Sequence, residues 1–190
     1  MNSPTSTSVP APSGLAALSS FRLNAYHQAV HDTARQTCGG PPACRQRKLA
    51  EAHDLLALAE MSRRLDVHWI DLTTDLRAKV RMRVPVPCRP HPDGPLRVAP
   101  FVFLGVTYPE RAAILPQPGY AFVRILAPGP IWHSNVGPEP NQVRCLGPSL
   151  PAGIPLKEIV LMTYGARTMQ TPHLALGPRL QNGEYSMLLI

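Results

Sequence analysis

The chain contains no long apolar segment and no stretch that resembles a secretory signal. Spanning a membrane takes roughly 18 or more consecutive apolar residues, and no segment approaches that length. A signal peptide needs a basic start and a continuous apolar run of about 7 to 15 residues, which the first residues do not supply. We therefore expect a cytoplasmic protein with no membrane partner.

Cysteine is also scarce, with four residues in a chain of 190, at positions 38, 44, 88 and 145. Thiols so few and so scattered do not form the disulfide framework of a small secreted domain. A chain of this length can bury a core of its own without such cross-links. We expect reduced thiols.

Aromatic and acidic side chains are few. Phe, Trp and Tyr make up 6% of the chain, and 12 acidic residues face 19 Lys and Arg, which gives a net charge of +7. The charge attracts acidic partners, but the shortage of rings leaves few platforms for stacking bases, and no nucleic-acid motif is present. The composition therefore predicts no nucleic-acid partner, and an acidic protein explains the charge equally well.

Composition divides the chain into four parts. Residues 1–20 hold no charged residue and few large apolar ones. Burial of so little apolar surface does not offset the conformational entropy lost on ordering, which predicts a disordered Ser/Pro/Thr tail. Residues 21–44 are interpreted as a partly helical N-terminal extension, and residues 45–172 as one domain. Residues 173–190 are predicted to form a C-terminal tail that packs on the core.

The stretch from Arg45 to Leu65 has the apolar spacing of an amphipathic helix. Its stripe consists of Leu49, Ala52, Leu55, Leu56, Leu58, Ala59 and Met61. Three basic residues, Arg45, Arg47 and Lys48, lie at its start, where they oppose the helix dipole. They are interpreted either as a solvated first turn or as a site that docks an acidic partner.

Four strands are expected after this helix, over 67–72, 78–86, 96–107 and 120–126. The second alternates apolar residues with basic ones, the period-two pattern of a strand with one buried and one solvated face. Such strands are typical of an antiparallel sheet. Residues Cys88 to Pro95 are interpreted as a loop on the far side of the sheet, and a second helix is predicted over Leu156 to Met169. The fold class is therefore α+β.

The irregular stretch between the fourth strand and the last helix carries the candidate chemistry. His133 and Asn135 are followed ten residues after the asparagine by Cys145. A cysteine thiolate can hold an acyl group as a thioester, and an amide donor nearby can stabilise the oxyanion formed on nucleophilic attack. Arg144 beside Cys145 could lower the pKa of the thiol. The sequence thus favours acyl transfer, with a small buried hydrophobe as the alternative role of Cys145.

The order of these elements resembles the ubiquitin-conjugating (E2-like) family. The matching residues are Tyr108-Pro109 after the third strand, His133-Ser134-Asn135 after the fourth, and Cys145-Leu146 before the last helix. Here Ser134 replaces the proline of the family signature, and Gly147 stands where many relatives carry an acidic residue. The resemblance covers about two thirds of the chain and implies the UBC-like fold: an N-terminal helix, a four-stranded antiparallel meander, an active-site loop and a C-terminal helix.

The resemblance also implies a function. Cys145 would accept a ubiquitin-like protein from an E1-like activating enzyme as a thioester and transfer it to an amine on a target protein, without a cofactor or metal. Asn135 would donate to the oxyanion or brace the loop, and His133 would more often be structural. The departures from the signature make the chain look like the E2-like proteins of bacterial operons, and several operons of that kind act in antiphage defence. The alternative is a catalytically silent binding or scaffold protein for the same modifier.

One further set of residues suggests a different site. His27 and His31 are four residues apart, on one side of a helix, and Cys38 and Cys44 follow. Together they could form a Cys2His2 zinc site, although their spacing matches none of the common frameworks well. The competing interpretation is a plain loop between two helices.

Overall fold

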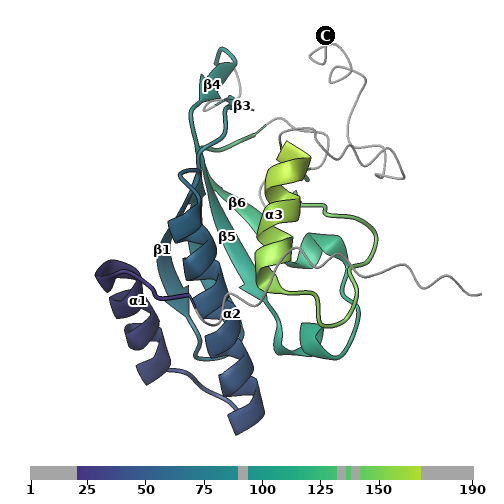
Figure 1. The fold of residues 1–190 in the computed structure, drawn as a ribbon. Coiled ribbons are helices and arrows are strands. Elements are labelled where there is room, and N and C mark those ends of the chain that lie inside the picture. Colours follow the sequence, from purple (N-terminus) through teal and green to yellow (C-terminus); the bar gives the residue numbers. More distant parts are fainter. Residues whose placement is uncertain (1–20, 90–93, 132–135, 138–141, 168–190) are drawn as a thin grey trace, which may run out of the picture.

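The computed structural model describes residues 21–89, 94–131, 136–137 and 142–167. Within these ranges the chain is a mixed α+β structure, as predicted, with helices packed on an antiparallel sheet (Figure 1). The helices are α1 (Ala25–Gln36), α2 (Pro42–Met61) and α3 (Leu156–Arg167). The strands are β1 (Leu65–Asp71), β2 (Leu76–Met82), β3 (Val86–Cys88), β4 (Arg97–Ala99), β5 (Val102–Tyr108), β6 (Val123–Ala127) and β7 (Val143–Arg144). Two short 3-10 helices, η2 (Glu110–Ala113) and η3 (Gly119–Ala121), connect β5 to β6.

The main sheet contains five strands in the order β1-β2-β5-β6-β7, and each neighbouring pair is antiparallel. The predicted meander is confirmed in its first four strands. The short fifth strand, β7, forms inside the stretch that we expected to be irregular. Its two residues pair with β6, an edge that the sequence pattern does not reveal because two residues carry no periodicity.

Strands β3 and β4 form a separate antiparallel pair that projects from the top of the sheet (Figure 1). The predicted strands over 78–86 and 96–107 are therefore each divided in two. Residues 83–85 lie outside the strands, because Pro85 has no backbone N–H to donate a hydrogen bond to a neighbouring strand. Cys88 was wrongly placed in a loop on the far side. It is buried at the end of β3 and bridges Ile131, next to the candidate active-site loop.

One face of the sheet is apolar and covered by the helices. Leu104 and Val106 of β5 and Val80 of β2 are buried on it, and α2 and α3 lie side by side across it (Figure 1). The predicted stripe of α2 is buried except for Leu49, which is half-buried, and Met61, which is 52% exposed at the helix end. Helix α2 begins at Pro42 instead of Arg45, because proline suits a first helical turn.

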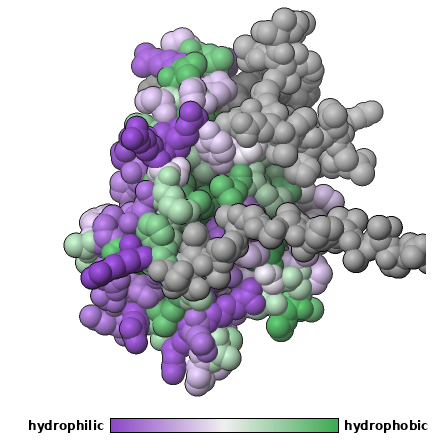
Figure 2. Space-filling view, in the orientation of Figure 1, coloured by the Kyte–Doolittle hydropathy of each residue, from purple (hydrophilic) through white to green (hydrophobic). Residues whose placement is uncertain are grey.

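The surface over the helices differs in character from place to place. Figure 2, which views the helix side, shows mainly hydrophilic residues over α1 and the lower part of α2, with hydrophobic surface toward the lower right. Two exposed apolar side chains follow η2, namely Ile114 and Leu115. None of the helices in the described ranges is both long and apolar enough to cross a bilayer.

Candidate functional site

Cys145 directly follows β7, at the edge of the main sheet. Its side chain is half-buried, with Sγ 3.7 Å from the carbonyl oxygen of Gly147. Pairing of Val143 and Arg144 with β6 fixes the backbone that leads into the cysteine. A thiol in this position is neither fully enclosed by the core nor carried on a free loop.

The segment that contains His133 and Asn135 lies outside the described residues, but the residues on either side of it are described. Val136 forms a bridge with Arg144, and the amide of Gly137 donates to the carbonyl of Val143 over 2.8 Å. Both bonds therefore tie the end of that segment to the strand that precedes Cys145.

Gln142 secures the other end of the same segment. Its buried side chain accepts a hydrogen bond from the Ile131 amide (3.1 Å) and donates to the Ile131 carbonyl (3.4 Å), in the manner of a backbone pair. Its own backbone has a φ of 33°, in the left-handed region that a non-glycine residue seldom occupies. Such a conformation persists where surrounding contacts fix it, and the amide contacts with Ile131 supply that constraint.

Gly119 of η3 lies directly against the backbone of residues 146 and 147, which follow Cys145. A Cβ on Gly119 would lie 2.4 Å from the carbonyl oxygen of Gly147 and 2.9 Å from the carbonyl carbon of Leu146. Only glycine leaves room for the hydrogen bond from the Gly119 amide to the Gly147 carbonyl, at 3.2 Å. Sequence reasoning missed this residue. The Pro118-Gly119 pair signals a turn, but it does not reveal what the turn touches.

Arg144 is fully buried, with 0% of its surface exposed, although we expected it to help the neighbouring thiol. Successive side chains of a strand point to opposite faces, so a buried Arg144 and a partly exposed Cys145 agree with strand geometry. The guanidinium is thus directed into the protein.

Lys48 also differs from the expectation of a partner-binding residue. Its side chain is 5% exposed, and its ammonium donates to the carbonyls of Leu72 and Thr74 and to Glu110 Oε1 at 3.0 Å. Lys48 therefore joins α2 to the β1–β2 turn and to η2, and is not available to a partner. We had counted it among the surface residues because its sequence neighbours are basic.

The other two basic residues of the cluster lie nearer the surface. Arg45 is exposed and donates to the carbonyl of Gly40 at 2.9 Å. Arg47 donates to the hydroxyl of Tyr108 at 2.6 Å and lies 3.7 Å from Glu51. Docking of an acidic partner through Arg45 and Arg47 stays a prediction.

A polar network around Tyr108 joins α2 to the start of α3. The Tyr108 hydroxyl donates to the carbonyl of Ile154 at 2.8 Å, and Glu51 Oε2 accepts from the amide of Leu156, the first residue of α3, at 2.8 Å. A carboxylate at a helix N-terminus satisfies an amide that has no partner within the helix. Burial raises the pKa of the Glu51 carboxyl and of the Tyr108 hydroxyl. The negative charge of Glu51 raises the pKa of Tyr108 further.

Three of the four residues considered for zinc have separate partners, and Cys44 is half-buried. His27 Nδ1 is 3.0 Å from Glu60 Oε1, and His31 Nε2 is 3.2 Å from the carbonyl of Leu49. Cys38 Sγ contacts the carbonyl of Arg45 at 4.0 Å. In the part of the chain that is described, no three His, Cys, Asp or Glu side chains are grouped so that they could hold a metal ion.

An apolar hollow of about 220 Å³ lies between the end of α2, the sheet and α3. It is lined mainly by Leu58, Met82, Val160 and Tyr164. Cys145 is not among its lining residues, and its polar side chains are those of Ser62, Arg64 and Tyr164.

Comparisons of the chain with protein-family models, with curated proteins and with solved structures gave no match. The function therefore rests on the residues and their geometry.

Proposed function

We propose that the protein is an E2-like carrier that holds a ubiquitin-like protein as a thioester on Cys145. The proposal rests on the resemblance of Tyr108-Pro109, His133-Ser134-Asn135 and Cys145-Leu146 to the ubiquitin-conjugating family. The order of helix, antiparallel meander, cysteine and helix supports it. By the same resemblance, the carrier would act in a bacterial conjugation system of the antiphage type.

One observation carries the proposal: the described residues on both sides of the His-x-Asn segment are bonded to residues 142–144, which lead directly into Cys145. Asn135 immediately precedes Val136, which bridges Arg144, and Arg144 immediately precedes Cys145. These contacts join the residue that follows Asn135 to the residue that precedes Cys145, which supports the assignment of Asn135 as the amide donor for a thioester on Cys145.

The proposed reaction has two acyl transfers. The thiolate of Cys145 attacks the thioester carbonyl that joins the modifier to the E1-like enzyme, and the enzyme's cysteine leaves as a thiolate. An amine of the target protein then attacks the new thioester, the Cys145 thiolate leaves, and the amine loses a proton as the amide forms. Asn135 would stabilise the oxyanion formed in the second step, when the amine attacks the thioester, and His133 would hold the loop.

The test is a non-reducing gel of the protein incubated with ATP, an E1-like enzyme and the ubiquitin-like protein which that enzyme activates. We expect a thiol-sensitive adduct with wild type, a thiol-resistant ester with Cys145→Ser, and no adduct with Cys145→Ala. Cys38→Ala is the matched control, because Cys38 is also half-buried but lies at the far end of α1, and its adduct should equal that of wild type. An adduct that persists in Cys145→Ala would overturn the carrier assignment.

The alternative is a silent binding protein for the same modifier. It is favoured if the E1-like enzyme becomes charged while the protein binds the modifier but forms no adduct. Asn135→Ala separates the two roles of the asparagine. An oxyanion donor predicts normal adduct formation and a loss of roughly 100- to 1,000-fold in transfer to the amine.

A further inference from the structure

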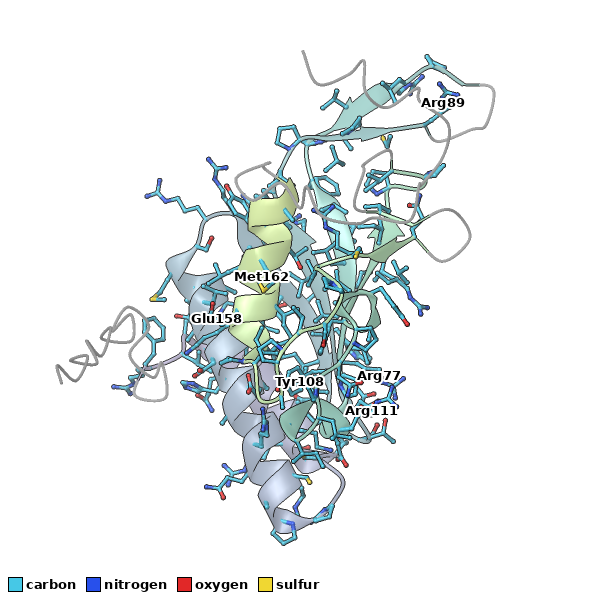
Figure 3. The ribbon with its side chains drawn as sticks, turned by 90° about the vertical axis from the view of Figure 1, so that its right-hand side faces the viewer. Arg77, Arg89, Tyr108, Arg111, Glu158 and Met162 are labelled. Atoms are coloured by element: carbon cyan, nitrogen blue, oxygen red, sulfur yellow. The ribbon has the colours of Figure 1, made fainter. Side chains whose placement is uncertain are left out.

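The face of the main sheet that points away from the helices is basic and aromatic. This outer face consists of Asp66, His68, Trp69 and Asp71 on β1, Arg77, Lys79 and Arg81 on β2, Phe103, Gly105 and Thr107 on β5, and Arg124 and Leu126 on β6. Phe101 and Arg83 adjoin it. Figure 3 shows Arg77 projecting from the sheet on the side opposite α2. We propose that the outer face binds single-stranded nucleic acid.

The first support is the arrangement of rings. The ring centroids of Phe101 and Phe103 are 5.4 Å apart, and that of His68 also lies 5.4 Å from Phe103. Trp69 is 50% exposed, opposite Lys79 in the β1–β2 register. His68 and Trp69 are exposed, and the two phenylalanines are half-buried. Rings presented on a sheet can stack unpaired bases, whose flat faces are hidden in a duplex.

The second support is the arrangement of charge. Arg77, Lys79 and Arg81 alternate along β2, so their side chains leave the sheet about 7 Å apart, a spacing comparable to that of successive phosphates in an extended strand. Lys79 and Arg124 lie on either side of Gly105 in register, so cations border both sides of β5. Basic side chains beside stacking rings are how sequence-tolerant single-strand sites are built.

The carboxylates of this face do not cancel the charge. Asp66 pairs with Arg81 and Arg83, and Asp71 pairs with Arg77. Among the described residues, Lys79 and Arg124 have no carboxylate partner. They are left to attract an anion.

Rings and cations are interleaved, which distinguishes a nucleic acid from an acidic protein as the occupant. Lys79 Nζ lies 4.9 Å from the centroid of Phe103, and the Arg81 guanidinium lies 5.9 Å from that of Phe101. An acidic protein would use the cations alone, whereas a nucleotide strand uses both. The low aromatic content argued against nucleic acid, but the fold gathers Trp69, Phe101 and Phe103 on one face.

The experiment measures the fluorescence anisotropy of labelled twelve-nucleotide oligo-dT and oligo-U, with a duplex of equal length and polyglutamate as competitors. We expect binding of the single strands that weakens with salt. Trp69→Ala should weaken binding roughly 5- to 150-fold with an unchanged salt slope, because it removes stacking and no charge. The double variant Lys79→Gln, Arg124→Gln should reduce the slope by about 1.4, which is two phosphates at about 0.7 each.

Arg35→Gln is the matched charge control, because Arg35 is exposed at the end of α1, in the helix layer. It should bind like wild type, as should Cys145→Ser, since this site does not depend on the proposed thioester. Thermal unfolding confirms that each variant is folded.

Three results would overturn the proposal. One is equal binding by Trp69→Ala and wild type. Another is competition by the duplex or polyglutamate as strong as that by the single strands, which is the behaviour of any basic protein. The third is the absence of binding to either single strand in about 50 mM salt, where phosphate contacts are strong.

Discussion

Two regions of the molecule are held in place by different kinds of contact. Around α2, charged side chains make the connections: Lys48 to two carbonyls and Glu110, and Glu51 to the start of α3. Around Cys145, the contacts named above that hold the backbone are uncharged, namely the Gln142 amide with Ile131 and the close approach of Gly119 to Gly147, while the buried guanidinium of Arg144 is directed into the protein. The comparison shows that the helix layer depends on buried charge, whereas the cysteine segment depends on backbone fit. Substitutions around α2 should therefore lower the free energy of unfolding, whereas those around Cys145 should also change the position of the thiol.

The largest effect on stability is expected at Lys48. Lys48→Met keeps the aliphatic stem but removes the ammonium, which leaves the buried carbonyl of Leu72 and the more exposed acceptors of Thr74 and Glu110 without their donor. We expect a loss of about 3 kcal/mol in the free energy of unfolding, measured in urea. Lys79→Met, on the outer face, should change it by no more than about 0.5 kcal/mol. Equal effects of the two substitutions would mean that the buried ammonium contributes nothing special.

Gly119→Ala tests the backbone fit around the cysteine segment. The new methyl group would collide with the Gly147 carbonyl, and the segment 146–147 must move, at a cost of about 1 to 3 kcal/mol. The rate at which a thiol reagent labels Cys145, followed by peptide mass spectrometry, should change as well. Gly129→Ala is the control, because a Cβ there meets no atom within 4 Å. An unchanged labelling rate in a destabilised variant would show that Gly119 does not position the thiol.

Gln142→Asn removes the bonds to Ile131 while keeping a residue that tolerates the left-handed conformation. The shorter amide cannot reach both backbone groups, and leaving them unpaired should cost about 1 to 3 kcal/mol. We also expect slower adduct formation on Cys145 in the gel assay, since the loop is no longer tied to its strand. Gln36→Asn, at the exposed end of α1, should alter neither quantity.

The smallest effect is a pH dependence of opposite sign in two carboxylates. Burial raises the pKa of Glu51 above its ordinary 4.5, so its contribution to stability falls as pH rises from 4.5 through the folded pKa. Hydrogen bonds from the amide and hydroxyl of Thr73 lower the pKa of Asp71 below 3.8. Its contribution is complete above 3.8 and is lost as pH falls through the folded pKa.

Urea denaturation from about pH 3 to pH 7 distinguishes these two groups. With Glu51→Gln, the free energy of unfolding should rise more steeply with pH above 4.5, because the falling contribution of the Glu51 carboxyl is removed. Asp71→Asn should flatten the profile below 3.8. If both variants keep the wild-type profile, neither carboxylate has the shifted pKa.

The comparison also explains which parts of the fold were predictable. The helix α2, the four-stranded meander and α3 follow from periodic apolar positions, which the sequence displays directly. Strand β7 and the β3–β4 pair were not predicted, since two or three residues show no period. Cys88 was misplaced for a related reason: the bridge from Cys88 to Ile131 joins residues far apart in the chain, and no local pattern reveals it.

Some of the candidate site was also visible in the sequence, but its supports were not. Cys145 stood out because a cysteine, an asparagine and a following helix occur together. Gln142 and Gly119 did not, because an amide and a glycine are ordinary loop residues until a specific backbone group lies beside them. Only their distances to Ile131 and Gly147 identify them.

The sequence by itself determined the α+β class, the order of the main elements and the candidate nucleophile, because periodicity and residue chemistry are local properties. The tertiary structure alone decided which polar groups are buried together and which face carries the rings and charges. The sequence around Lys48 suggests a surface residue, but the side chain is buried. Trp69 and Phe103, two of the chain's few aromatic residues, lie on one basic face. Burial and proximity depend on contacts between distant segments, and no stretch of sequence contains them.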